Sequence, residues 1–230
     1  MSKVLSDYLY YHEPGPPEIK IYCGDCLEIM PLLPKVDLVV TDPPYGIDFS
    51  GDGYSDIDES VYSEKLEFLQ GFPLALLQYP EEMMRLVVPA LGPPSDVLTW
   101  CYNSNTNRQH RLWGFWNCDV DFSRVKVPCK NPTDPRVNQM VASYDWVTDF
   151  QQVKNVSVEK TDHPCQIPVG LVKRVIEVVE CASILDPFLG SGTTLVACKE
   201  LKRNGIGIEI NEKYCSIAVK RLKNTQVPFL

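Results

Sequence analysis

A run of apolar, largely β-branched residues stops at two consecutive prolines, and this junction limits the possible folds more than any other part of the chain. Residues 36–41 read VDLVVT and lead directly into Asp42-Pro43-Pro44-Tyr45. A short run of this composition predicts a buried β-strand. The prolines lack N–H groups and cannot continue the strand, so they fix the backbone just past its end. Because α/β folds bind ligands beyond the carboxyl ends of their strands, we expect a ligand site at this corner.

The corner carries groups suited to an amino group on a planar ring. Asp42 and the carbonyl of Pro43 can accept hydrogen bonds from an –NH2 group, and Tyr45 can stack on the ring. The same tetrapeptide is compatible with an ordinary turn, since Asp-Pro and Pro-Pro are common turn pairs. Taken alone, the corner leaves the catalytic and the structural interpretation open.

A second motif of this kind lies near the C-terminus. Residues 183–194 read SILDPFLGSGTT and are followed by a helical apolar face, which predicts a strand, a glycine turn and the start of a helix. Gly190 and Gly192 let the backbone approach a ligand closely, and a helix N-terminus favours an anionic group. The motif has neither the lysine and spacing of a P-loop nor the third glycine of the dinucleotide fingerprint. A carboxylate-bearing ligand fits better, such as the methionine end of S-adenosylmethionine.

A short apolar strand follows this motif and ends in an acid. Residues 205–210 read GIGIEI, which places Glu209 at the strand end. An acid in this position suits a ribose diol, as in other nucleoside-binding α/β folds. The glycine turn, the spacing and the acid together favour a nucleoside-containing cofactor.

These residues resemble the β-class DNA amino-methyltransferases, which methylate N6 of adenine or N4 of cytosine. Four blocks match in that family's permuted order, at residues 22–30, 42–45, 163–168 and 186–194 with Glu209. The catalytic blocks come first and the cofactor blocks last, unlike the order in protein glutamine methyltransferases, which share a similar tetrapeptide. The match is good over residues 19–46 and 162–224 and weak between them.

The resemblance implies an α/β, Rossmann-like methyltransferase fold that is circularly permuted, with a mostly parallel sheet flanked by helices and a small target-recognition insertion. It implies transfer of a methyl group from S-adenosylmethionine to the exocyclic amino group of a base flipped out of duplex DNA. We expect N6 of adenine, because the aspartate-led corner is commoner in the family's adenine enzymes; N4 of cytosine is the alternative. A restriction–modification role follows from the same resemblance.

The resemblance also implies the site residues. The expected catalytic residues are those of the corner, Asp42, Pro43, Pro44 and Tyr45. The expected cofactor-binding residues come from all four blocks: Asp25, Cys26, Asp42, Gln166, Asp186, Phe188, Gly190, Ser191, Gly192, Thr193 and Glu209. Within this set, the resemblance assigns Asp25 to the adenine of the cofactor. The family usually has lysine where this chain has Ile167, so one contact to the methionine end differs.

The pattern of elements predicts one domain with an N-terminal arm. We expect an arm at residues 1–18 and a single methyltransferase domain at 19–230, divided into a catalytic half (19–102), a recognition region (103–160) and a cofactor half (161–224). Strands are predicted at 19–23, 36–41 and 96–102, and near 120–127 and 140–147. Helices are predicted at 25–33, 73–91, 105–115, 168–181 and 211–224. Residues 46–71 lack periodicity and predict a mobile loop that closes over the flipped base.

The charge is acidic overall but unevenly distributed. The net charge is −8, and acids concentrate between residues 42 and 100. Residues 101–137 are richer in basic side chains and form the candidate phosphate-facing surface. The candidate DNA contacts are Arg108, Arg111, Arg124, Lys126, Lys130 and Arg136. Four aromatics of this stretch could stack on bases, but their spacing favours the core: Tyr102, Trp113, Phe115 and Trp116.

The cysteines and the termini predict an intracellular protein. Nine cysteines are scattered through apolar runs, which favours reduced, buried thiols. Cys23 and Cys26 have metal-like spacing, but no second pair completes a zinc site, and we expect no metal. No apolar stretch is long enough to span a membrane, and the first residues do not read as a signal peptide. We expect a cytoplasmic protein of a bacterium or a phage, and the family allows a homodimer.

Two other interpretations fit part of the pattern. The chain could be a catalytically inactive, nucleic-acid-binding partner of an active methyltransferase, although retention of both the corner and the glycine turn argues against this. It could also act on RNA or on a free nucleoside, which the acidic balance leaves open.

Overall fold

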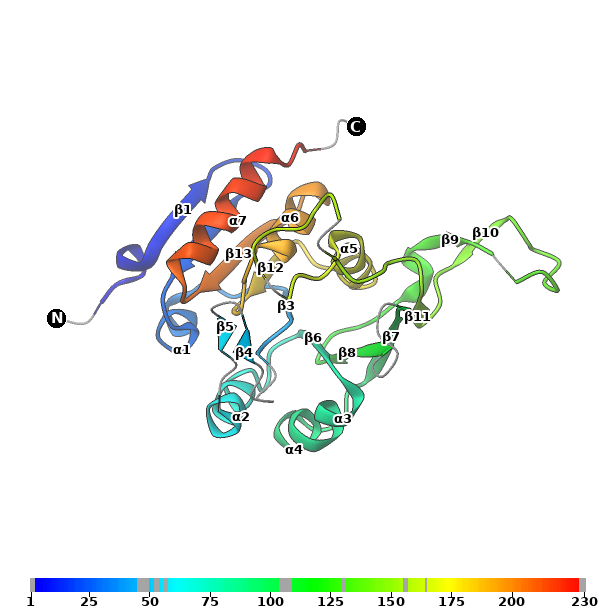
Figure 1. The fold of residues 1–230 in the computed structure, drawn as a ribbon, viewed down its shortest axis with the longest axis horizontal. Helices are drawn as coiled ribbons and strands as arrows, with labels where there is room; N and C mark the ends of the chain where they lie inside the picture. The colour runs from blue at the N-terminus through cyan, green and yellow to red at the C-terminus, as the bar shows by residue number, and fades with distance from the viewer. Residues whose placement is uncertain are drawn as a thin grey trace.

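One nine-stranded sheet runs through the molecule, with helices on both faces (Figure 1). The computed structural model describes residues 3–44, 50–51, 54–55, 58–103, 109–129, 131–154, 157–163 and 165–227. The strands of the sheet follow the order β1 (Leu9–Glu13), β2 (Ile19–Cys23), β13 (Asn204–Glu209), β12 (Ser183–Asp186), β3 (Leu38–Thr41), β6 (Leu74–Gln78), β8 (His110–Trp116), β7 (Asp96–Cys101) and β11 (Trp146–Val147).

Five neighbouring strands of this sheet are parallel, in the order β2, β13, β12, β3 and β6. Strands β12 and β13 come last in the chain yet lie between β2 and β3, which is the permuted arrangement that the sequence predicts. The register pairs Leu185 with Val39 across β12 and β3. The Asp42 corner and the glycine turn therefore follow adjacent strands, and both lie at the edge of the sheet formed by the carboxyl ends of the parallel strands.

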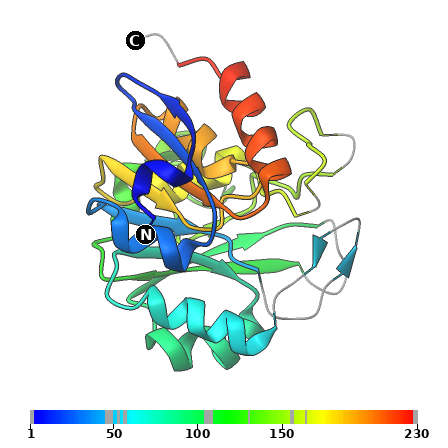
Figure 2. The ribbon, with the colours of Figure 1, turned by 90° about the vertical axis from the view of Figure 1, so that its left-hand side faces the viewer.

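The three helices of the cofactor half cover one face of the sheet (Figures 1 and 2). They are α5 (Val169–Glu177), α6 (Thr193–Glu200) and α7 (Glu212–Asn224). Asn211 caps α7 by accepting a hydrogen bond from the Lys213 N–H at 3.0 Å, which confirms the helix start predicted from the sequence. Leu195 of α6 and Ala218 of α7 join Ile21 of β2 in one fully buried apolar cluster.

Other helical segments cover the opposite face. They are α1 (Cys26–Ile29), α2 (Glu59–Phe68) and a continuous segment made of α3 (Pro80–Glu82), a π-turn (Met83–Val87) and α4 (Val88–Leu91). Leu66 of α2 and Val87 pack against Leu76 of β6 in a second buried cluster. With apolar residues buried on both faces, the central strands are apolar throughout, as parallel strands are expected to be.

Two small hairpins lie outside this sheet. Strands β9 (Lys126–Pro128) and β10 (Met140–Ala142) pair antiparallel and project away from the body of the molecule (Figure 1). Strands β4 (Ser50–Gly51) and β5 (Tyr54–Ser55) form the second hairpin. The β9–β10 hairpin is the part of the expected recognition region that is separate from the main sheet.

The structure corrects three expectations about elements. Residues 73–91 are not one helix, because Leu74–Gln78 form the fully buried strand β6 before the helical segment begins. The described part of 105–115 is strand β8, not helix, and it lies inside the sheet rather than in a separate recognition region. The expected loop at 46–71 contains helix α2 and the β4–β5 hairpin.

The N-terminal segment adds one strand to the sheet. Strand β1, within the expected N-terminal arm, pairs antiparallel with β2 and extends the sheet at its edge. Within the described ranges, no helix combines the length and the apolar character needed to cross a membrane.

Candidate active site

The carboxyl ends of the parallel strands place most predicted site residues at one edge of the sheet. Asp25 follows β2, Asp42 follows β3, and the glycine turn follows β12. Glu209 is the last residue of β13, beside the glycine turn. Groups that are far apart in the sequence meet here because neighbouring parallel strands end together.

Asp186 ties the strand that precedes the corner to the glycine turn. Its carboxylate accepts hydrogen bonds from the hydroxyls of Thr41 at 2.9 Å and Thr194 at 2.6 Å, and from the Phe188 N–H at 3.1 Å. Burial raises the pKa of Asp186 to about 6, and the nearby Asp42 carboxylate acts in the same direction. Asp186 therefore connects the end of β3 with the glycine turn and α6 through buried hydrogen bonds.

The glycine turn is closely packed against the protein itself, while the predicted approach to a ligand stays a prediction. Gly190 and Gly192 have φ values of +52° and +85°. A Cβ atom at Gly192 would lie 2.7 Å from the Cβ of Ala218, and one at Gly190 would lie 2.9 Å from Nε2 of His163. Side chains at either position would be both strained and crowded, so the turn depends on glycine.

Glu209 stabilises this turn directly. One carboxylate oxygen accepts the Gly190 N–H at 2.8 Å, and the other accepts the Asn211 N–H at 2.8 Å. Burial raises the pKa of Glu209, while these two backbone bonds oppose the shift. Each oxygen keeps further acceptor capacity for a ligand hydroxyl.

Two residues beside the turn were not predicted from the sequence. Arg221 of α7 donates to the backbone carbonyl and the hydroxyl of Ser191, both at 3.0 Å, and to the hydroxyl of Thr193 at 2.9 Å. Burial of the imidazole lowers the pKa of His163 to about 4, with Lys160 and Arg221 adding to the effect. His163 is therefore neutral at neutral pH. Only the fold brings these residues to the turn.

The expected adenine end of the cofactor site contains an additional lysine. Asp25 caps α1 by accepting the Leu27 N–H at 2.9 Å, and Lys65 of α2 lies 3.2 Å from the same carboxylate oxygen. The Lys65 ammonium is also 3.6 Å from the sulfur of Cys26 and 5.8 Å from the centroid of the Phe188 ring. Asp25, Cys26 and Phe188 thus all lie around the Lys65 ammonium, and their contact with the cofactor stays a prediction. Lys65 was missed because α2 was expected to be loop.

Gln166 has a structural use in addition to any contact with the cofactor. Its side-chain oxygen accepts the backbone N–H of Thr161 at 3.0 Å and the Thr161 hydroxyl at 2.9 Å. Its side-chain nitrogen donates to the Glu159 carbonyl at 2.6 Å. These bonds fold the segment before α5 against the site. Ile167, next to it, is buried in the apolar core.

The corner itself is described as far as Pro44. The side chain of Asp42 is 15% exposed, and its Oδ2 lies 3.8 Å from Nη1 of Arg111. Tyr45 lies outside the described residues. Arg111 is 8% exposed, so the expectation that it faces DNA phosphates on the surface is wrong: β8 turns the side chain inward, toward the corner.

The other candidate DNA contacts have different environments. Arg108 and Lys130 lie outside the described residues. Arg124 pairs with Glu180 at 3.0 Å, and Arg136 pairs with Asp134 at 2.8 Å. Lys126 is exposed on the β9–β10 hairpin.

The expectation that the aromatics of residues 101–137 belong to the core is confirmed. The four aromatics expected in the core are buried: Tyr102, Trp113, Phe115 and Trp116. All nine cysteines are free thiols, five of them buried. Among the described residues, no cluster of His, Cys, Asp and Glu has the makeup of a metal site.

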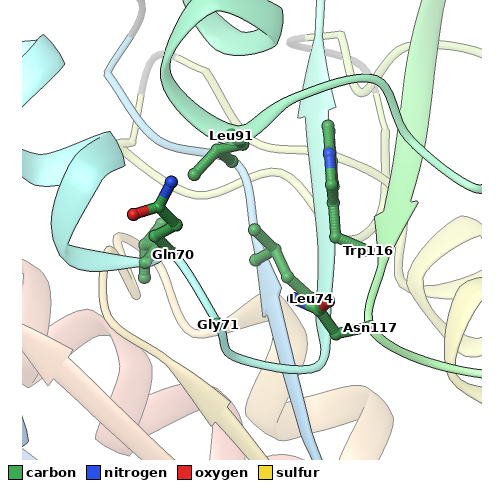
Figure 3. A pocket seen from close by; sticks show the side chains of 7 residues that line it. Gln70, Gly71, Leu74, Leu91, Trp116 and Asn117 are labelled. Carbon is green, nitrogen blue, oxygen red and sulfur yellow. The ribbon is translucent and has the colours of Figure 1, made fainter.

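A cavity of about 240 Å³ lies apart from these groups (Figure 3). Leu74, which begins β6, and Trp116, which ends the antiparallel β8, place it at the opposite edge of the sheet. Its lining residues are Leu69, Gln70, Gly71, Leu74, Leu91, Trp116 and Asn117. The cavity therefore does not belong to the candidate site.

Comparison with known proteins agrees with this geometry. A family model described as DNA methylase, whose name covers both N6 and N4 targets, matches residues 91–220, more than half of the chain. The Type II methyltransferase M.ScaI of Streptomyces caespitosus is 29% identical over 90% of this chain and 82% of its own length. The DNA adenine methyltransferase YhdJ of Escherichia coli K12 is 28% identical over 86% of this chain and 81% of its own length.

A solved structure gives the same result at the level of the fold. The complex of M1.HpyAVI with S-adenosylmethionine superimposes with a TM-score of 0.60 and 25% identity, covering 89% of this chain and 98% of that one. The chain therefore belongs to the family of S-adenosylmethionine-dependent DNA methylases that modify the exocyclic amino groups of bases.

Proposed function

We propose that the protein methylates N6 of adenine in duplex DNA. The observation that carries this proposal is the adjacency of the Asp42 corner and the glycine turn, joined through Asp186 at one edge of the sheet. An acceptor for an amino group and a cradle for a carboxylate-bearing cofactor are thereby neighbours. The aspartate at the head of the corner and the similarity to an adenine methyltransferase support adenine. The family model's N4 targets keep cytosine as the alternative.

The residues present fit S-adenosylmethionine. The glycine turn after β12 carries no side chains at Gly190 and Gly192, which leaves its backbone open to close approach, and Glu209 presents acceptor capacity suited to a ribose diol beside it. Asp25 and Phe188 lie together where the adenine of the cofactor is expected. When bound, the cofactor supplies a methyl group that is activated by its sulfonium charge.

Asp42 acts on the amino group of the base. The lone pair of that nitrogen is delocalised into the ring, which makes it a poor nucleophile. Hydrogen bonds from –NH2 to the Asp42 carboxylate and the Pro43 carbonyl favour a more tetrahedral nitrogen. They strengthen as positive charge develops there, which stabilises the transition state. The proton leaves after the methyl group has arrived, so no dedicated histidine base is required; the neutral His163 is consistent with this.

Access to the amino group requires a flipped base. In a duplex the amino group lies inside the stack, so the base must rotate into the site, where Tyr45 is proposed to stack on it. We assign backbone contacts to the exposed Lys126 on the projecting β9–β10 hairpin, together with Arg124 and Arg136. The protein would work where bacterial DNA lies, in the cytoplasm, and as a monomer or a homodimer.

Nucleoside analysis tests the proposed target. Duplex DNA is incubated with the protein and labelled S-adenosylmethionine, digested to nucleosides and separated, with single-stranded DNA and RNA in parallel. We expect the label in N6-methyladenine from duplex DNA. Label in N4-methylcytosine alone would replace adenine by cytosine, and label confined to RNA would reject DNA as the substrate.

A further inference from the structure

A buried arginine stands against the proposed catalytic carboxylate. The side chain of Arg111 is 10% exposed, and its Nη1 lies 3.8 Å from Oδ2 of Asp42. Strand β8 is antiparallel to β6, so its first residues lie at the edge where the parallel strands end. Arg111 therefore reaches the corner from strand β8, inside the sheet, and does not lie on a surface that faces DNA phosphates.

Aromatic side chains fix the position of this guanidinium. Nη2 of Arg111 donates a hydrogen bond to the Tyr79 hydroxyl at 3.0 Å. The guanidinium carbon lies 4.7 Å from the centroid of the Tyr79 ring and 5.7 Å from that of Trp100. Tyr79 directly follows β6, and Trp100 pairs with Arg111 across β7 and β8. Planar stacking and a directed donor hold a guanidinium in a way that a lysine ammonium cannot reproduce fully.

The corner has an electrostatic requirement that this cation meets. Asp42 lies close enough to the buried Asp186 to raise the pKa of that carboxyl, so two like charges repel each other beside the corner. A base that enters the site removes water from Asp42, which disfavours the charged form further. An opposite charge within about 4–6 Å favours the charged form and offsets both effects.

We propose that Arg111 is a positioning residue for methyl transfer, which holds the Asp42 carboxylate in place and keeps it ionised when a base enters the site. Tyr79 supports Arg111 in this role through its hydroxyl and its ring. The inference rests on the proposed role of Asp42 in the reaction. The charged and titratable groups near this pair include Asp186 from β12, and Tyr79 and Tyr102 beside the guanidinium.

Titration of Asp42 tests the inference without DNA. The carboxyl carbon of Asp42 is followed by 13C NMR across pH and assigned with the Asp42→Asn variant. In Arg111→Met we expect the Asp42 titration to move up by at least about one pH unit, since a neighbouring cation typically lowers a carboxyl pKa by about 1–3 units. In Arg111→Lys, the Asp42 titration should lie between those of the wild type and of Arg111→Met. Arg85→Met serves as the control, because Arg85 pairs with Glu59 on the exposed face of another helix.

Kinetics on the same variants separate positioning from folding. We expect kcat to fall at least tenfold in Arg111→Met and less in Arg111→Lys, with the Kd for S-adenosylmethionine changed by less than about threefold. Tyr79→Phe, which keeps the ring and loses the hydroxyl, should lower kcat in the same direction and replaces Arg111→Met if that variant does not fold.

Two results would overturn the inference: an Asp42 titration that does not move in Arg111→Met, or equal losses of kcat in the Lys and Met variants. A wild-type protein that transfers no methyl group would instead reject the proposed function. The titration would still decide whether Arg111 controls the ionisation of Asp42.

Discussion

Single side chains at this site support the fold in addition to the ligand roles proposed for them. Glu209 is predicted from the sequence as an acid at a strand end, and the structure places it there. Its hydrogen bond to the Gly190 N–H is a second role that the sequence does not reveal, because it joins two segments that only the sheet brings together. Arg111 shows the same limit: a basic residue in a basic stretch suggests phosphate binding, and only the direction of β8 turns it toward Asp42.

Replacement of Glu209 should weaken cofactor binding. Hydrogen bonds to a charged group contribute about 1.5–3 kcal/mol each. Glu209→Ala removes the acceptor proposed for the ribose and releases the Gly190 N–H, so we expect the Kd for S-adenosylmethionine to rise at least tenfold in calorimetry. Glu209→Gln keeps an acceptor oxygen, so its Kd should lie between those of the wild type and of Glu209→Ala. The nearby, exposed Glu212→Ala is the control. An unchanged Kd in Glu209→Ala would reject the assignment.

The elements differ in how clearly the sequence specifies them. Strand β13 and helix α7 carry clear end signals and are found where the sequence predicts them. Strand β6 was missed because a central strand buried on both faces is apolar throughout, and its period cannot be distinguished from that of a buried helix. Strand β8 was predicted as a helix for a related reason. Pairing with β6 and β7 on either side makes these residues a strand, and their own hydrophobic pattern does not reveal this.

The turn between β12 and α6 allows a matched test with two glycines. Gly192 and Gly71 have φ values of +85° and +86°, so alanine meets a similar backbone cost of about 1–2 kcal/mol at either position. A Cβ at Gly192 would lie 3.0 Å from the Cα of Ala218, whereas one at Gly71 would have nothing within 4 Å. Crowding of this kind typically adds about 1–3 kcal/mol.

We therefore expect Gly192→Ala to lower the free energy of unfolding more than Gly71→Ala does, and to weaken S-adenosylmethionine binding, which Gly71→Ala should leave unchanged. Denaturant unfolding and calorimetry measure the two effects. Equal losses of stability and equal affinities in the two variants would show that packing against α7 does not shape the turn.

At the scale of the whole molecule, the chain order explains why the site is composite. The segment with the corner precedes the segments that form the glycine turn by more than a hundred residues, yet β12 lies directly beside β3. The block order predicted this arrangement, since each motif marks the end of a strand. The contacts of Arg111 with Tyr79 and Trp100 could not be predicted, because they lie where the match to the family is weakest and because the pairing of β6, β8 and β7 creates them.

The central claim is that the Asp42 corner and the glycine turn form one methyl-transfer site with separate tasks. The most direct measurement is labelled methyl transfer to duplex DNA by the wild type and by Asp42→Ala, paired with calorimetry of S-adenosylmethionine binding to both. The account predicts that the wild type transfers the label, that Asp42→Ala loses transfer, and that its cofactor Kd rises only modestly. Turnover in Asp42→Ala close to that of the wild type would contradict the account.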